Sequence, residues 1–344
     1  MRLSIVEGHI ITYILRMQYV ISDKWVDYEL LDAGDGEKLE RWGEVILRRP
    51  DPQVIWPAQK NSAFWEKVDA VYHRSEKGGG SWEFKKEIVS GHASKKSICE
   101  VKWIIEYGDL KFYIKAMSFK HTGLFPEQGE NWDWMRAKIK AAKRPVSVLN
   151  LFGYTGGATV ACAKEGASVC HVDASKGMVY HASENMELNG LKDAPVRWIV
   201  DDVVKFVERE IKRGKTYDAI LMDPPSYGKG PKGETWKAEE DLYMLIEKCA
   251  KLLSKTPVFF LINSYTTGFS PMVLKNIMEL TVNSRLYNGR AHGASAQAGE
   301  KELRNQERLR EAEPYNIQFG EVGLPISDSK LVLPCGVFAR YARA

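Results

Sequence analysis

The sequence predicts an α/β fold in which a small β-rich N-terminal domain precedes a mostly parallel, doubly wound sheet that ends in an antiparallel C-terminal hairpin. From residue 146 onward, short apolar runs alternate with segments of helix length. The first of these runs breaks into a glycine-rich turn at residues 150–157. Before residue 118, turn residues alone separate the apolar runs. Repeated strand–helix units imply right-handed crossovers and a ligand site at the carboxyl ends of the strands.

This pattern divides the chain into four stretches. Residues 1–20 form an extension of uncertain order, and residues 21–117 form the β-rich domain. Residues 118–145 form a junction loop and helix, and residues 146–344 form the ligand-binding domain. A chain of 344 residues is long enough for two domains of roughly 150 residues each.

Composition narrows the class of protein. Lys and Arg number 49 against 45 Asp and Glu, and this net charge of +4 fits both an ordinary surface and a polyanionic partner. The five cysteines form no CxxC pair and no Cys/His cluster, so we expect no metal site and a reducing, cytoplasmic environment. No apolar run approaches the roughly 18 residues of a membrane span, so no membrane partner is expected.

The first half of the chain is expected to be rich in strands. Strands are predicted at residues 28–32, 45–48, 101–107 and 110–114. The last two flank Gly108 and Asp109, which predicts a β-hairpin. A helix is expected at 132–143, because Pro145 follows it. Whether this half docks a nucleic acid or only closes the ligand site is left open by the sequence.

In the ligand-binding domain, strands and helices are expected to alternate. The predicted strands are residues 146–152, 168–173, 197–200, 218–223 and 258–263. The predicted helices are residues 158–167, 178–189, 203–212, 238–253 and one after Pro271. Residues 284–313 are polar and are assigned no chemistry, while residues 316–324 and 330–344 predict the closing hairpin at the sheet edge.

The glycine-rich turn and the end of the second strand predict a nucleoside site. Glycine allows close approach of a ligand, and the helix that follows the turn begins with unpaired N–H groups. The turn Asn150–Gly157 does not have the GxGxxG spacing of dinucleotide sites. Asp173, at the end of the second strand, could accept both hydroxyls of a ribose. Alternatively it could cap the next helix, where Ser175 stands in a similar context.

Two further carboxylate motifs follow the third and fourth strands. Asp202 is expected to contact the exocyclic amine of an adenine, and Asp201 to cap the helix that begins at Val203. In Asp223-Pro224-Pro225-Ser226-Tyr227, the prolines cannot donate hydrogen bonds, so the Asp223 carboxylate and the Pro224 carbonyl are predicted to accept them from a planar nitrogenous substrate. The alternative is a rigid turn.

The loop after this motif is glycine-rich and carries Lys229, Lys232 and Trp236. Lysines and an aromatic ring at a cleft mouth suit phosphate contact and base stacking, so the three residues are predicted to bind substrate. A mobile surface loop is the alternative.

Together these motifs resemble the class I S-adenosylmethionine-dependent methyltransferases, which have a Rossmann-like fold. Within them the chain resembles the bacterial branch that includes the large-subunit ribosomal RNA cytosine-C5 and guanine-N7 methyltransferases. The resemblance rests on the turn at 150–157, Asp173, the helix end Glu184–Leu191, Asp202 and the motif that begins at Asp223. The junction His121-Thr122-Gly123, with Phe125 and Gln128, resembles the loop that closes over the cofactor in that family.

The resemblance implies S-adenosylmethionine as cofactor and direct methyl transfer to an acceptor base. The residues it implies for cofactor binding are Thr122, Phe125, Asn150, Phe152, Gly153, Tyr154, Thr155, Gly156, Gly157, Asp173, Ser175, Met178, Asp201 and Asp202. Those implied for catalysis are Asp223, Pro224, Pro225, Ser226 and Tyr227.

The chain departs from this family where the acceptor atom is decided. Transfer to carbon five of a pyrimidine needs a cysteine thiolate, which relatives carry after the fifth strand or after the prolines. Here Ser264 and Ser226 stand in those regions, and Cys249 is expected to be a buried structural thiol. We therefore expect a nitrogen acceptor in ribosomal RNA, with guanine N7 and an exocyclic amine both open. A protein or small-molecule substrate, or a noncatalytic RNA-binding role, are the alternatives.

Overall fold

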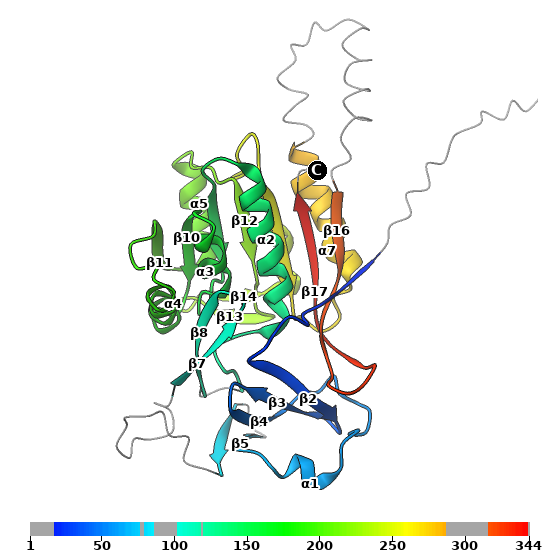
Figure 1. Cartoon of the computed structure of the whole chain (residues 1–344). Helices are drawn as coiled ribbons and strands as arrows, with labels where there is room; N and C mark the ends of the chain where they lie inside the picture. Colours follow the sequence, from blue (N-terminus) through cyan, green and yellow to red (C-terminus); the bar gives the residue numbers. More distant parts are fainter. Residues whose placement is uncertain (1–16, 76–78, 86–101, 118–119, 287–315, 343–344) are drawn as a thin grey trace, which may run out of the picture.

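The computed structural model describes residues 17–75, 79–85, 102–117, 120–286 and 316–342 (Figure 1). Its centre is an eight-stranded sheet in the order β1-β16-β17-β15-β12-β9-β10-β11. The five strands from β15 to β11 are parallel, as the strand–helix alternation predicts. Their bounds are β9 Ser147–Leu151, β10 Ser168–Asp173, β11 Val196–Val200, β12 Ala219–Met222 and β15 Phe259–Ser264. The predicted α/β fold is therefore confirmed.

Helices cover both faces of this sheet because successive strand residues point to opposite sides. In β9, Val148 packs into one core cluster and Leu149 into the other. On the Val148 side lie α2 Gly129–Ala142, α3 Gly157–Lys164 and α4 Lys176–Leu188. On the Leu149 side lie α5 Val203–Lys212, α6 Ala238–Ala250, α7 Pro271–Met278 and the short π-helix η3 Glu279–Asn283.

The C-terminal hairpin is antiparallel, as expected, but it does not form the sheet edge. Strands β16 Asn316–Pro325 and β17 Val332–Ala342 pair with each other, and β17 pairs with β15. A strand from the start of the described chain, β1 Gln18–Ile21, then adds to β16 in parallel. Gly320 permits this pairing, since a Cβ there would lie 1.8 Å from the carbonyl oxygen of Gln18. Four residues are too few to show strand periodicity, so the sequence did not reveal this edge.

A second sheet of five strands lies near the carboxyl ends of the parallel strands (Figure 1). Its strands are β2 Tyr28–Gly34, β3 Glu37–Trp42, β4 Val45–Pro50, β5 Ala70–Arg74 and β6 Gly80–Phe84, and helix α1 Ser62–Trp65 lies between β4 and β5. The β-rich N-terminal region that the sequence predicts is thus present.

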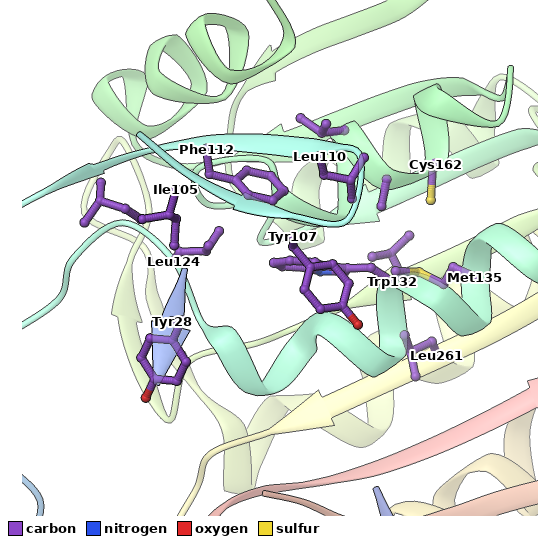
Figure 2. Packing of buried hydrophobic residues seen from close by; sticks show 14 of the residues in the cluster. Tyr28, Ile105, Tyr107, Leu110, Phe112, Leu124, Trp132, Met135, Cys162 and Leu261 are labelled. Atoms are coloured by element: carbon purple, nitrogen blue, oxygen red, sulfur yellow. The ribbon is translucent and has the colours of Figure 1, made fainter. Parts of the chain in front are cut away.

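The predicted hairpin, β7 Lys102–Tyr107 and β8 Leu110–Lys115, forms a two-stranded sheet of its own. Asn185 on α4 accepts a hydrogen bond from the Tyr113 N–H at 2.9 Å, which fixes the hairpin to that helix. On its other side, Phe112 lies 5.1 Å from Trp132 of α2, ring centroid to ring centroid (Figure 2). The hairpin therefore packs on the helices of the large sheet as well as on the N-terminal strands.

Two further observations complete the fold. The polar connection predicted at 284–313 lies outside the described residues from 287 on. In the part of the chain that the structure describes, no helix combines the length and the apolar character that crossing a membrane requires.

Candidate functional site

The glycine-rich turn between β9 and α3 is tightly wound. Phe152 and Tyr154 have φ values of 55° and 49°, and Gly156 has φ 84° immediately before α3. Non-glycine residues in this left-handed region are uncommon and mark sites where the surrounding structure holds the chain in place. Here Gly153 N–H donates to the Val172 carbonyl at 3.0 Å, which pins the turn to the neighbouring strand β10.

Gly153 has a steric reason to be glycine. A Cβ at this position would lie 2.4 Å from Cε1 of the His171 ring. His171 is buried in β10, and its Nδ1 lies 2.9 Å from Oγ1 of Thr159 on α3. The ring forms the floor of the turn and leaves no room for a side chain above it.

Asp173 ends β10 and is bonded to the turn rather than to a helix end. Its Oδ2 accepts the Tyr154 N–H at 2.9 Å, and its Oδ1 accepts the Ser175 N–H at 2.8 Å. The cap of α4 is Ser175, whose hydroxyl accepts the Met178 N–H at 3.4 Å. Each carboxylate oxygen of Asp173 keeps a free lone pair, which suits the two hydroxyls of a ribose. Of the two roles left open by the sequence, capping is therefore taken by Ser175.

The helix cap predicted at Asp201 lies at Asp202 instead. The Oδ1 of Asp202 accepts the Lys205 N–H of α5 at 2.9 Å, in the geometry of an N-cap. Asp201 forms an ion pair with Arg209, which lies further along the same helix. Asp202 still faces the candidate site, but Asp201 does not.

A cavity of about 690 Å³ opens beside these residues. The predicted site residues that line it are Phe125, Phe152, Tyr154, Asp173, Ser175, Asp202, Asp223, Pro224, Pro225, Lys229 and Trp236. A smaller cavity of about 60 Å³ shares Phe125, Phe152, Tyr154 and Asp223 with it and is also lined by Asn150, Gly153, Thr155 and Gly157. The structure thus brings together residues from widely separated segments of the sequence.

Seven predicted site residues do not line either cavity. They are Thr122, Gly156, Met178, Asp201, Ser226, Tyr227 and Lys232. Thr122 is buried behind the wall, where its carbonyl accepts the Lys115 N–H at 2.9 Å. Tyr227 is 57% exposed, because the chain turns outward after Pro225 into the β-ribbon β13 Tyr227–Lys229 and β14 Thr235–Lys237.

Trp236 differs from its predicted role as a stacking platform. Only 7% of the residue is exposed, and its ring lies 5.1 Å from that of Phe152. The indole Nε1–H donates to the Pro225 carbonyl at 2.7 Å. Since the ring is buried against Phe152, Trp236 braces the proline turn and does not offer an open face at the cavity mouth.

Asp223 lies in the cavity wall and differs from Asp173 in its hydrogen bonding. Its Oδ1 is buried and accepts no hydrogen bond from the residues that the structure describes. Burial, with a smaller contribution from the charge of Glu127, raises the pKa of Asp223 to about 8. A buried acceptor without a donor is costly, so its retention points to a ligand that supplies the donor.

The pKa of Asp223 predicts a pH-dependent stability. Because the folded-state pKa exceeds the ordinary value of 3.8, the folded protein keeps a proton that the unfolded chain loses as the pH rises. The stability that the folded protein gains from this proton is complete below pH 3.8 and is lost as the pH rises through about 8. Asp223→Asn, which cannot ionise, should therefore raise the melting temperature at pH 9 and leave it nearly unchanged at pH 4, in cofactor-free protein.

Asp218 provides the control for that measurement. Burial raises its pKa, but hydrogen bonds from Ser147 and Ser254 outweigh burial and lower it below 3.8. Asp218→Asn should consequently lower the melting temperature more at neutral pH than at acid pH. A melting temperature of Asp223→Asn that follows the wild type at every pH would contradict the prediction for Asp223.

Several cavity residues were not predicted from the sequence. Those with polar or titratable side chains are Lys38, Arg49, Asp51, Gln53, Lys120, His121, Glu127, Tyr265, Thr267 and Cys335. Arg49 of β4 is buried and donates to both oxygens of Glu40 at 2.6 and 2.7 Å, which holds the N-terminal sheet at the cavity wall. His121 and Glu127 fall within the junction motif, which the sequence does distinguish, whereas no sequence motif marks Lys38 of β3 or Arg49 of β4.

Cysteine chemistry is not supported at this site. Cys249 is buried in α6, as expected of a structural thiol, and burial raises its pKa above the usual 9.0. Cys335 of β17 does reach the cavity wall. Burial and the charge of Glu127 raise its pKa well above the usual 9.0, so the thiol stays protonated and is a weak nucleophile.

The residues present fit the cofactor that the sequence motifs imply. Asp173 presents two oriented acceptor oxygens, and Gly153 and Gly157 leave the backbone of the turn free of side chains beside the smaller cavity. Asp223 adds a buried acceptor that lacks a donor among the described residues. A ligand with ribose hydroxyls, a polar tail and a positive centre would satisfy these groups together.

Comparison with known proteins gives matches over most of the chain. The profile of a family described as S-adenosylmethionine-dependent methyltransferase matches residues 87–268, more than half of the chain. The crystal structure of a SAM-dependent methyltransferase from Agrobacterium tumefaciens is 32% identical, with a TM-score of 0.78, and the match covers 94% of this chain and 93% of that one.

Curated relatives match over shorter stretches. Ribosomal RNA large subunit methyltransferase K from Neisseria meningitidis serogroup B is 26% identical over 238 residues, which are 67% of this chain and 64% of that protein. Ribosomal RNA large subunit methyltransferase I from Aeromonas salmonicida is 30% identical over 164 residues, which are 46% of this chain and 39% of that protein. The chain therefore spans less than two thirds of the length of either relative.

Proposed function

The chain belongs to the family of S-adenosylmethionine-dependent methyltransferases, and from this premise we propose that it methylates a nitrogen atom of a base in large-subunit ribosomal RNA. The observation that carries the proposal is the buried Oδ1 of Asp223, which lacks a hydrogen-bond donor among the described residues at the wall of the 690 Å³ cavity. S-adenosylmethionine is the cofactor of this family, and it supplies a methyl group already activated on a sulfonium sulfur.

The cofactor would lie along the edge of the sheet formed by β9, β10 and β11. Asp173 would hold the ribose hydroxyls, and Asp202, with the oxygen that does not cap α5, would face the adenine. The turn from Phe152 to Gly157 would hold the methionine part next to the smaller cavity. These residues bind and orient, which is the main contribution of a protein to a displacement reaction.

The acceptor base would lie against Asp223, Pro224 and Pro225. The unpartnered Oδ1 of Asp223 and the carbonyl of Pro224 can accept hydrogen bonds, while neither proline can donate one. Nitrogen is favoured over carbon because the thiol of Cys335 stays protonated. Ribosomal RNA is favoured by the names of the relatives, both of which are ribosomal RNA large subunit methyltransferases.

Replacing Asp173 tests the cofactor site. Asp173→Ala removes the ribose acceptor and also releases the Tyr154 N–H that shapes the turn. Because hydrogen bonds to a charged group contribute about 1.5–3 kcal/mol, affinity for S-adenosylhomocysteine should fall by about 10- to 100-fold. Isothermal titration calorimetry measures this directly. Unchanged affinity would remove Asp173 from the site.

The function itself is tested with labelled S-adenosylmethionine. The protein is incubated in parallel with large-subunit ribosomal RNA transcribed without modifications, with total protein and with a small-molecule extract. Label in RNA is expected. Label only in protein or only in small molecules would show that those molecules, and not RNA, are the substrates. Cofactor binding without any transfer would indicate a noncatalytic RNA-binding protein.

A further inference from the structure

We propose that Glu127 accepts a proton in this reaction and that the acceptor is an exocyclic amine of the base, not a ring nitrogen. The inference rests on the proposed function and identifies the class of nitrogen that is methylated. Glu127 lies on η2 Pro126–Gln128, in the junction between the N-terminal sheet and the helix α2. No role was predicted for it from the sequence.

Glu127 is a buried carboxyl that faces the same cavity as Asp223. The residue is 6% exposed, and it lines the 690 Å³ cavity together with Asp223 and Pro224. The charge of Glu127 contributes to the raised pKa of Asp223, which places the two carboxyls within electrostatic reach of each other. The acceptor would therefore lie between two carboxyl groups that come from different parts of the chain.

The position of Glu127 is held by a polar and aromatic support. Tyr265, which follows β15, lines the same cavity as Glu127, and its hydroxyl acts to lower the pKa of that carboxyl. Gln128 donates its Nε2–H to the same hydroxyl at 2.7 Å. The Tyr265 ring is stacked on Phe125, with centroids 5.4 Å apart and planes at 26°. A carboxyl supported in this way is oriented before a substrate arrives, which is a requirement for efficient proton transfer.

The hydrogen-bonding character of this wall distinguishes the two classes of nitrogen. Where the base is proposed to lie, Asp223 Oδ1 and the Pro224 carbonyl are acceptors, and prolines 224 and 225 offer no N–H. The cationic side chains that line the cavity, Lys38, Arg49 and Lys120, come from the N-terminal sheet and the junction instead. Guanine N7 is itself an acceptor and is flanked by the acceptor O6, so it would face like groups here. An exocyclic amine carries two N–H donors and can satisfy two of these acceptors at once.

The chemistry also differs between the two classes. When an exocyclic amine reacts, the nitrogen lone pair forms the N–C bond to the methyl carbon and the C–S bond breaks with its electron pair going to sulfur. The nitrogen then carries one proton too many, and that proton passes to the Glu127 carboxylate. Methylation at N7 releases no proton and has no use for a base.

The surroundings of Glu127 favour this role. Burial raises its pKa, and the charge of Lys38 partly offsets the effect. The other charged or titratable groups around it are Glu40, Arg49, Asp223, Cys335 and Tyr265. A carboxyl with a raised pKa is a stronger base than an ordinary one and works closer to neutral pH.

The test uses the full chain with unmodified large-subunit ribosomal RNA and mass spectrometry of the digested nucleosides. The wild-type product should be a nucleoside methylated on its exocyclic amine. Glu127→Gln should lower the single-turnover rate by about 10²-fold or more, as expected for loss of a general base. Its affinities for S-adenosylhomocysteine and for RNA should not change. In the wild type the rate should rise with pH as Glu127 loses its proton, and this rise should be absent in Glu127→Gln.

Two further variants separate a chemical role from a structural one. Glu127→Asp keeps a carboxyl and should recover part of the rate that Glu127→Gln loses. Glu130→Gln, on the first turn of α2 and ion-paired with Lys24 outside the cavity wall, should behave as the wild type. A 7-methylguanine product, or a Glu127→Gln variant with the wild-type rate, would overturn the inference and leave the proposed function standing. Failure of the wild type to label RNA would instead overturn the proposed function.

Discussion

Asp223→Ala is expected to reduce methyl transfer by about 10²–10³-fold, the usual effect of removing an oriented group that stabilises the transition state in a buried site. Its Oδ1 is buried without a donor in the described part of the chain, so the cost of that arrangement is offset only when an acceptor base provides an N–H. The variant should still bind S-adenosylhomocysteine as the wild type does, because Asp173 and the turn are unaffected.

Single-turnover transfer of labelled methyl and calorimetric binding of S-adenosylhomocysteine together measure this effect. A matched control is Asp193→Asn, since Asp193 is an exposed aspartate in the turn before β11. If Asp223→Ala transferred methyl at the wild-type rate, the motif would be only a rigid turn. If it lost binding of S-adenosylhomocysteine, Asp223 would belong to the cofactor site instead.

The order of strands and helices could be predicted because each strand ends at a polar residue or a turn. The apolar runs that end at Phe152, Asp173 and Asp223 lie in the predicted parallel sheet. Strand β1 could not be predicted, because its four residues show no period and its partner β16 lies some 300 positions away in the chain.

The candidate site was predictable on the side of the parallel sheet only. Asp173 and Asp223 stand at strand ends, where topology alone brings them to one edge. Lys38 and Arg49 also line the cavity, but they belong to strands of the N-terminal sheet in which polar and apolar residues alternate. In such a strand the sequence does not distinguish a buried charged residue, such as Arg49 paired with Glu40, from an exposed one. The predicted helix cap at Asp201 was wrong for a similar reason. Asp201 pairs with Arg209, which only the folded helix brings close to it, and Asp202 caps the helix instead.

Gly153→Ala is expected to weaken cofactor binding through sterics alone. Gly153 does not have the positive φ of Gly156, so alanine is compatible with its backbone. The new Cβ would lie 2.4 Å from Cε1 of His171, and that ring is held by Thr159 in a fully buried position. The turn or the ring must move. Overpacking of this kind costs about 1–3 kcal/mol, so affinity for S-adenosylhomocysteine should fall by about 10- to 100-fold.

Gly166→Ala separates this effect from backbone strain. Gly166 has φ 79°, and a Cβ added there would meet no atom within 4 Å, so alanine strains the backbone without a clash. Its melting temperature should fall while its affinity for S-adenosylhomocysteine stays unchanged. The double variant Gly153→Ala/His171→Ala removes the ring that the new methyl group meets, and it should bind more tightly than Gly153→Ala alone. Equal affinities of the single and double variants would show that the ring beneath the turn is not what requires glycine.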